Sequence, residues 1–314
     1  MGRIRLRLGR TRRALVLMTS QDILLALVGI TVAGYLFNTI LELLNLRVQQ
    51  REIPDEVAEF YNPEKYLRSL DYHRDKSKLD LLVSGLSALA FLGMLFLGGF
   101  GFLDSFLRQY VEAPIPLALV FFATLLLLSD WLTLPFQWYA TFVIEERYGF
   151  NKTTPRTFVT DKLKGYVLGA LLGAPLLSVL LLLIERIGPG FWLWFGAIAG
   201  LFVLFMNMFY TTLIVPLFNR LTPLPDGDLK SGIESFARKV DFPLDSIFVI
   251  DGSKRSSKAN AFFSGIGSKK KVVLFDTLIQ NHTTDELIAV LAHEVVHFKK
   301  NHIILSFVLS LFQI

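Results

Sequence analysis

Five long apolar runs constrain the fold of this chain more than any other feature of its sequence. Each run has about 20 or more mostly apolar residues, enough for a helix to cross a hydrocarbon core about 30 Å thick. Charged residues make up only 19% of the chain, whereas soluble domains average about 25%. We therefore predict a mainly α-helical integral membrane protein, with residues 1–218 forming a multi-pass domain. The runs cover roughly 23–44, 79–102, 114–138, 165–184 and 191–218.

A sixth apolar run begins at Ile303 and continues to Ile314. A helix of that length reaches only about 18 Å, which is too short to cross a bilayer. We expect residues 303–314 to be the start of a truncated sixth span, and the chain to be one part of a longer polypeptide. A short helix packed on the preceding domain is the alternative.

The basic residues between the apolar runs predict an orientation. Segments 45–78, 139–164 and 219–302 hold seven, five and twelve Lys or Arg, 24 in total, while the two other loops hold one each. Basic loops usually face the cytoplasm, so we expect segment 219–302 to be cytosolic. The membrane would be the plasma (inner) membrane of a bacterium or the endoplasmic reticulum of a eukaryote. Six arginines in the first 13 residues oppose this topology, because it leaves the N-terminus outside.

Residues 219–302 form the one large polar segment, for which we predict a small α+β domain. Thr283 and Glu286 have the spacing of a capping box, which predicts the start of a helix that continues through Leu291. Nothing in the segment interleaves aromatic and basic residues in the way that would suggest nucleic-acid binding. Short apolar runs that predict strands lie at 247–250, 259–264 and 271–275, the last two joined by a turn at 265–270.

The sequence His293-Glu294-Val295-Val296-His297 carries the chemistry. Residues four apart on a helix share one face, so the two imidazoles can bind one Zn²⁺ at about 2.0–2.1 Å. Glu294 lies beside the metal, where it can act as general base toward the attacking water. The pattern therefore predicts a zinc hydrolase in which His293 and His297 hold the metal. Two histidines on the polar face of an amphipathic helix, with a solvated Glu, are the structural alternative.

A catalytic zinc normally has three protein ligands and one open position, and a third ligand is not apparent here. The chain has no Cys. Glu286 shares the helical face of His293 but lies about 10 Å along the axis, and His302 points to roughly the opposite side. His282 precedes the helix, and His73 is placed in a distant loop.

Four stretches resemble the integral-membrane CAAX prenyl protease 1 family of zinc metalloproteases. They occur in the family's order and at matching places relative to the spans, and together they cover roughly residues 139–302. Residues 1–138 resemble the family only in their pattern of spans. The stretches are EERYGFNKTT at 145–154, PLFNR at 216–220, SKRSSKANAFF at 253–263 and LAHEVVH at 291–297.

The resemblance implies a seven-span helical barrel around a water-filled chamber, with a zincin-like catalytic domain near the cytosolic side. It implies a third zinc ligand, a Glu, on a helix downstream of this sequence. The substrates it implies are prenylated C-a-a-X peptides, cut at the C-terminal tripeptide. Val296 departs from the Gly that the family commonly has at its position, and the downstream Glu helix is not in this sequence.

Asn260, Ala261 and Phe262 are predicted to form an edge strand before the zinc helix. Such a strand can bind an extended peptide through its backbone. The resemblance makes Asn260 a substrate-positioning residue, and an ordinary polar strand residue is the alternative.

Several charged residues outside the zinc motif have two interpretations. Lys254, Arg255, Lys258 and Lys269 to Lys271 would attract anionic lipid or an acidic peptide, or form a solvated face. Glu145, Glu146 and Arg147 either hold the catalytic domain or form an interfacial ion-pair cluster.

The leading hypothesis is a membrane zinc endopeptidase that cleaves a peptide or a prenylated protein C-terminus. The first alternative is a catalytically silent membrane scaffold with the same fold, or a fragment that is inactive without its C-terminal part. A transporter is less well supported, because few charged residues lie at mid-membrane depth.

Overall fold

The computed structural model describes residues 19–49, 53, 55–264 and 270–300. The predicted sixth span, residues 265–269 of the predicted turn at 265–270 and His302 lie outside these ranges. The chain divides into two compact units, one ending at Ser105 and the other beginning at Phe106. The predicted domain boundary at residue 218 and the cytosolic placement of the polar segment stay predictions.

The first unit consists mainly of two long helices that pack against each other, α1 (Ser20–Val48) and α2 (Pro63–Phe96). A 3₁₀ helix, η1 (Asp55–Phe60), lies between them. Helix α2 begins earlier than predicted, because Asn62 caps it and Pro63 occupies its first turn. His73 therefore lies in a helix and not in a loop.

The predicted span at 79–102 is not a single helix. Helix α2 ends at Phe96, and α3 (Gly99–Leu107) begins three residues later. Gly98 has a φ of 70°, a conformation that glycine adopts without the steric cost of a side chain. The apolar run was continuous in sequence, but this turn divides it.

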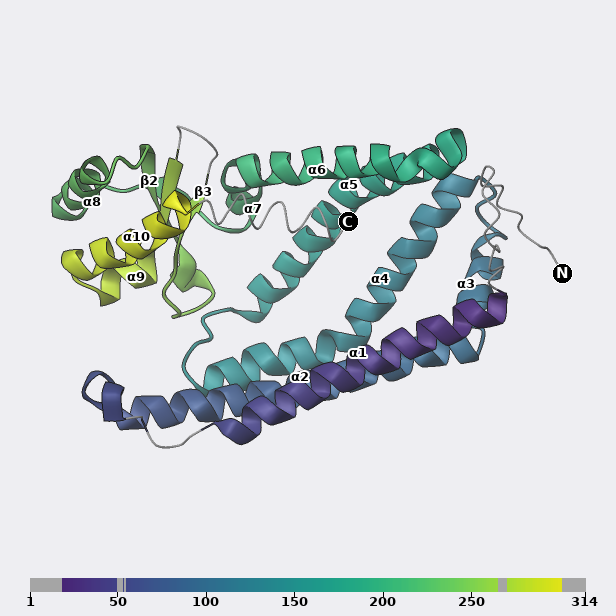
Figure 1. Cartoon of the computed structure of the whole chain (residues 1–314), viewed down its shortest axis with the longest axis horizontal. Coiled ribbons are helices and arrows are strands. Elements are labelled where there is room, and N and C mark those ends of the chain that lie inside the picture. Colours follow the sequence, from purple (N-terminus) through teal and green to yellow (C-terminus); the bar gives the residue numbers. More distant parts are fainter. Residues whose placement is uncertain (1–18, 50–52, 54, 265–269, 301–314) are drawn as a thin grey trace, which may run out of the picture. The chain divides into compact units, whose positions relative to one another are not determined.

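The second unit begins with the remaining apolar helices. Helices α5 and α6 pack against each other as an antiparallel hairpin around the short 3₁₀ turn η3 (Figure 1). Two π-helical segments, η2 and η4, directly follow α4 and α6, and α7 continues from η4 toward the sheet. The bounds are α4 Pro114–Tyr139, η2 Ala140–Glu145, α5 Pro155–Ile187, η3 Gly188–Gly190, α6 Phe191–Phe209, η4 Tyr210–Ile214 and α7 Val215–Phe218.

In the described chain, four helical stretches are long and apolar enough to cross a membrane. The last of them, Pro155–Met206, contains the fourth predicted span and the first part, 191–206, of the fifth. The expectation of a mainly helical membrane protein is confirmed, while five complete spans and the seven-span barrel stay predictions. The four stretches are Ser20–Val48, Pro63–Phe96, Pro114–Glu145 and Pro155–Met206.

A four-stranded sheet follows the helices, with the strand order β1-β2-β4-β3. Strands β2 and β4 run parallel, and β1 and β3 pair antiparallel at the two edges. The three predicted strands are present with bounds shifted by up to three residues, and β1 was not predicted. The bounds are β1 Leu221–Pro223, β2 Leu244–Ile250, β3 Ala261–Ser264 and β4 Lys270–Phe275.

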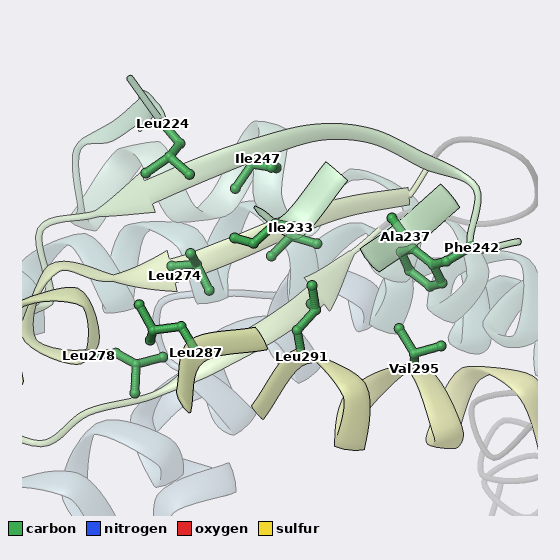
Figure 2. Packing of buried hydrophobic residues seen from close by; sticks show 11 residues of the cluster. Leu224, Ile233, Ala237, Phe242, Ile247, Leu274, Leu278, Leu287, Leu291 and Val295 are labelled. Carbon is green, nitrogen blue, oxygen red and sulfur yellow. The ribbon is translucent and has the colours of Figure 1, made fainter. Parts of the chain in front are cut away.

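Three helices accompany the sheet: α8 (Asp228–Lys239), α9 (Asp276–Asn281) and α10 (Thr284–Lys299) (Figure 1). Figure 2 shows their apolar side chains packed with those of β2 and β4 in one buried cluster. Ile233 of α8 and Val272 of β4 are 0% and 1% exposed. The opposite face of the sheet contacts α7, where Val273 packs with Val215. The sheet is therefore held between its own helices and the end of the transmembrane helices.

Candidate active site

Helix α10 carries the predicted zinc motif at residues 293–297, and its start is fixed by the predicted capping box. The Thr283 N–H and hydroxyl donate to Glu286 Oε2 at 2.8 and 3.0 Å, and the Glu286 N–H donates back to Thr283 Oγ1 at 3.4 Å. The backbone and hydroxyl hydrogen bonds from Thr283 lower the pKa of the Glu286 carboxyl below its ordinary value. The capping-box prediction is confirmed.

One face of α10 is buried and the opposite one is exposed. Leu287, Leu291 and Val295 are each 3% exposed and point into the core beneath the helix (Figure 2). Their spacing of four residues is that of a single helical stripe. His293 is exposed, and so is Val296, at 49%. The core therefore anchors α10 through its apolar stripe and leaves the face of His293 open.

The helical backbone of α10 continues through His297, one turn beyond His293. Residues at this spacing lie on the same face of the helix. The side chains of Glu294 and His297 lie outside the described part of the structure, so the roles of all three motif residues stay predictions.

The other described histidines lie away from the motif's helical face. His282 Nδ1 lies 3.0 Å from the Leu278 carbonyl oxygen, and His73 Nε2 lies 3.9 Å from Glu42 Oε1. Among the residues that the structure describes, no three His, Asp or Glu side chains converge in a way that could hold a metal ion. The imidazole donors of α10 suit zinc chemically, but the described residues do not add the third ligand.

Strand β3 is the edge of the sheet beside which α10 packs. The Phe275 N–H donates to the Asn260 carbonyl at 3.1 Å, and Phe262 pairs with Val273. Because hydrogen-bonded pairs alternate along an antiparallel ladder, the backbone groups of Ala261 and Phe263 point away from β4. Within the described chain no strand covers that edge. The prediction that these residues form an edge strand is confirmed for Ala261 and Phe262.

Asn260 lies one residue before β3 and not within it, in contrast to the prediction. Its exposed side chain accepts a hydrogen bond from the Ala261 N–H at 2.9 Å. That N–H is one of the backbone groups at the uncovered edge. The Asn260 side-chain oxygen therefore already accepts the hydrogen bond of the Ala261 N–H, the first donor that an incoming strand would meet.

The loop that leads to β3 is tied to the loop between α4 and α5. Asn151 and Ser256 form a β-bridge, and the Lys152 N–H donates to the Arg255 carbonyl at 3.0 Å. Ser257 adds hydrogen bonds from its N–H to Phe150 O at 3.1 Å and from its hydroxyl to Gly149 O at 2.8 Å. Two of the stretches that resemble the protease family, 145–154 and 253–263, therefore lie against each other.

Arg255 connects three parts of the second unit at this junction. Its Nε and one terminal nitrogen donate to the two carboxylate oxygens of Asp161 in α5, at 2.7 and 2.9 Å. The same terminal nitrogen donates to the Phe218 carbonyl at the end of α7, at 2.8 Å. Both side chains of the ion pair are only 23% exposed. A bidentate pair with this geometry fixes direction as well as distance.

Glu145 joins the same junction from the other side. Lys258 Nζ lies 3.0 Å from the Glu145 carboxylate and 4.7 Å from the centre of the Phe150 ring. The interpretation in which Glu145 holds the catalytic domain gains support from this contact. Sequence reasoning missed the Asp161–Arg255 pair, because the partners are 94 residues apart.

Comparison with known proteins agrees with these motifs. Residues 42–220 match the family described as "CAAX prenyl protease N-terminal, five membrane helices", and residues 223–314 match "Peptidase family M48". The CAAX prenyl protease 1 homolog of Arabidopsis thaliana is 38% identical over 293 residues, which are 90% of this chain and 68% of that protein. The human homolog is 31% identical over 326 residues, 88% of this chain and 68% of that protein.

Solved structures agree as well. The crystal structure of S. mikatae Ste24p superposes with a TM-score of 0.85 at 33% identity, covering 92% of this chain and 70% of that one. The chain spans about two thirds of the length of its curated plant relatives, 68% and 67%. The family models and these relatives together show that the chain belongs to the CAAX prenyl protease 1 family of membrane-embedded M48 metallopeptidases.

Proposed function

We propose that this protein is a zinc metalloendopeptidase in which His293 and His297 bind the metal and Glu294 is the general base. The observation that supports the proposal most directly is the H-E-x-x-H sequence on the anchored helix α10, with His293 on its exposed face. Two imidazoles one turn apart match the donor set that zinc prefers. The third ligand would be the Glu that the family resemblance places on a downstream helix.

The residues of this chain have distinct parts in the proposed reaction. When bound, Zn²⁺ would polarise the peptide carbonyl and make hydroxide available near neutral pH. Glu294 follows His293 directly, so it lies about 100° around the helix from that ligand. From there its carboxylate would orient the attacking water, accept its proton and deliver that proton to the leaving amine.

We further propose that the substrate peptide binds as an added strand along β3. Ala261 and Phe263 would hydrogen-bond to the peptide backbone. For this to happen, the Asn260 amide must release the Ala261 N–H to which it is bonded at 2.9 Å. The amide can then hydrogen-bond to the peptide instead, which gives Asn260 a positioning role. Asn260→Ala should raise KM more than it lowers kcat.

The proposed substrates are prenylated C-a-a-X peptides on the cytosolic side of the membrane. The names of the relatives describe CAAX prenyl proteases, and the basic-residue count of the loops supports a cytosolic sheet region. The chain has no Cys, so a single Lys239→Cys variant can report the orientation. An impermeant thiol reagent should label it only after the membrane is opened, and labelling of intact cells or sealed vesicles would reverse the topology.

The test of the mechanism compares two variants of the full-length protein reconstituted in lipid. His297→Ala should lose most of the bound zinc, because only one helix ligand remains. Glu294→Gln should keep its zinc and its affinity for a prenylated peptide, but cleave that peptide about 10²–10⁴-fold more slowly. Metal content, peptide binding and cleavage are measured on the same preparations. Equal zinc in wild type and His297→Ala, or near-normal cleavage by Glu294→Gln, would refute the assignment.

A further inference from the structure

A basic pocket lies at the junction between the α5–α6 hairpin and the sheet, separate from α10. The cavity has a volume of about 570 Å³. Its walls come from residue Lys164 of α5, from the segment 216–221 and from the turn η5 (Gly252–Lys254) together with Asp251. None of these residues belongs to the zinc motif or to the uncovered edge of β3.

The pocket has an excess of positive charge. Lys164, Arg220 and Lys254 line it, against the single carboxylate of Asp251, so three positive and one negative side chain give +2. The carboxylate is already engaged, because Asp251 Oδ1 accepts from the Arg220 N–H at 2.7 Å and from Asn219 Nδ2 at 3.0 Å. An anion that enters the pocket would therefore meet three cationic side chains. The one carboxylate there, Asp251, already accepts hydrogen bonds from the protein.

The three cations keep donors available for a ligand. Among the described residues, the side chains of Arg220 and Lys254 form no ion pair with a carboxylate. Lys164 Nζ donates to the Leu217 carbonyl at 2.7 Å, which leaves two of its three hydrogens. The neighbouring Arg255 and Lys258 differ, because Asp161 and Glu145 neutralise them. The structure thus divides the basic 254–258 stretch into paired residues and one cation that faces the pocket.

The positions of two of these cations in the sequence point to a membrane surface. Lys164 is the last charged residue before the apolar part of α5, and Arg220 is the first one after the charge-free stretch 191–219. Because α5 and α6 form an antiparallel hairpin, both cations belong to the end of the hairpin that joins the sheet. Leu217, 47% exposed, adds an apolar wall beside them. Cations beside apolar surface at the end of a span are a typical arrangement for binding lipid headgroups.

We propose that this pocket binds the phosphate group of an anionic phospholipid, with Lys164, Arg220 and Lys254 as its ligands. The phosphodiester oxygens accept charge-assisted hydrogen bonds from the guanidinium and the two ammonium groups. The acyl chains continue from the pocket along the apolar surface of the hairpin. A bound lipid would connect the hairpin to the turn η5, which leads to the Arg255 junction.

The experiment measures binding of phosphatidylserine to the full-length protein in nanodiscs of phosphatidylcholine, by native mass spectrometry. Arg220→Gln/Lys254→Gln should bind roughly thirtyfold more weakly than wild type, since each basic residue near a lipid surface contributes about fivefold to the affinity. Arg238→Gln/Lys239→Gln removes two exposed positive charges from α8, outside the pocket, and should bind normally. Arg220→Lys/Lys254→Arg keeps both charges and should retain most of the affinity, which separates loss of the site from misfolding.

Further measurements distinguish a lipid phosphate from free inorganic phosphate as the ligand. Phosphatidylserine should raise the thermal midpoint of the detergent-solubilised wild type, while inorganic phosphate at the same concentration should not. Equal effects of the two ligands would overturn the lipid assignment in favour of a small-anion site. Equal losses in the pocket and α8 double variants would show general surface attraction and would also overturn it. The lipid assignment would also be overturned if an acidic peptide displaced the bound lipid at concentrations at which added free lipid does not displace it.

Discussion

The sheet region and the apolar helices place their hydrophobic residues in opposite ways. The sheet and its helices enclose a core in which Ile233 and Val272 are 0% and 1% exposed. Helix α1, in contrast, has no buried residue, and in α5 Leu171 is 68% exposed. The sheet region therefore derives its stability from apolar burial in water, as a soluble domain does. The helices expose the surface that a bilayer covers, so lipid contact takes the place of a protein core.

Polar contacts also hold two of the apolar helices, α4 and α5, to each other. Asp130 of α4 accepts hydrogen bonds from Lys162 Nζ at 2.6 Å and from the Tyr166 hydroxyl at 2.5 Å, both on α5. Such groups in a membrane helix are costly unless they are paired. This polar cluster thus contributes a specific contact between α4 and α5.

The largest predicted effect separates the two kinds of surface directly. Ile233→Ala in α8 removes a side chain that is 0% exposed, and should destabilise the sheet region by about 2–5 kcal/mol because a cavity remains. Leu171→Ala in α5 removes a similar volume from a surface that is 68% exposed, and should change stability by less than about 0.5 kcal/mol. Thermal midpoints and limited proteolysis of both variants in detergent are the measurements. Comparable losses would mean that Leu171 is covered by protein.

An intermediate effect is expected where the two regions join. Arg255→Ala breaks the bidentate pair with Asp161 and the hydrogen bond to Phe218, and should lower stability by about 1.5–3 kcal/mol. The matched control is Arg238→Ala, whose partner Glu234 is 4.0 Å away and whose side chain is 73% exposed. Exposed pairs contribute about 0–1 kcal/mol. A double-mutant cycle with Asp161→Ala isolates the pairwise energy.

The Arg255 variant also tests the link between the junction and the site. If the junction holds β3 in place, the variant should process peptide substrates with a raised KM, and Arg255→Lys should recover only part of the loss. Lys keeps the charge but cannot form the planar bidentate contact. Full activity of Arg255→Ala at a temperature at which it remains folded would show that the junction does not position the strand.

Local signals in the sequence predicted the elements that carry the proposed chemistry. The capping box at Thr283 and the apolar stripe through Leu291 predicted α10, and both are present. Strand β1 was missed because a three-residue segment ending in Pro223 has no strand pattern, and only its pairing with β2 defines it. Segment 63–78 was assigned to a loop because its many charged residues exclude it from an apolar span. The helix start signals at Asn62 and Pro63 were nevertheless in the sequence.

Contacts between distant parts of the chain could not be predicted. The Asp161–Arg255 pair and the basic pocket both depend on how α5 meets the turn after β2, about 90 residues later. No pattern within a short window carries that information. The same limit applied to the edge of β3: the strand was predicted from its residues, but the backbone groups that face outward follow only from the register with β4.

The smallest predicted effect tests how far the start of α10 depends on charge. Hydrogen bonds from the Thr283 N–H and hydroxyl lower the pKa of Glu286 below its ordinary 4.5. A lowered pKa in the folded state means that the carboxylate stabilises the fold above its ordinary pKa, and that this contribution is lost as the pH falls through the folded-state value. Glu286→Gln keeps the shape of the side chain but has no charge. Wild type should therefore protect the α10 amides from hydrogen exchange better than Glu286→Gln at pH 6–7, and the difference should disappear in acid.

Asp285→Asn removes an exposed charge from the same turn without breaking the capping box, and should have a smaller effect. A difference between wild type and Glu286→Gln that persists unchanged down to the lowest pH at which both proteins stay folded would show that the geometry of the capping box, and not the charge of Glu286, fixes the start of the helix.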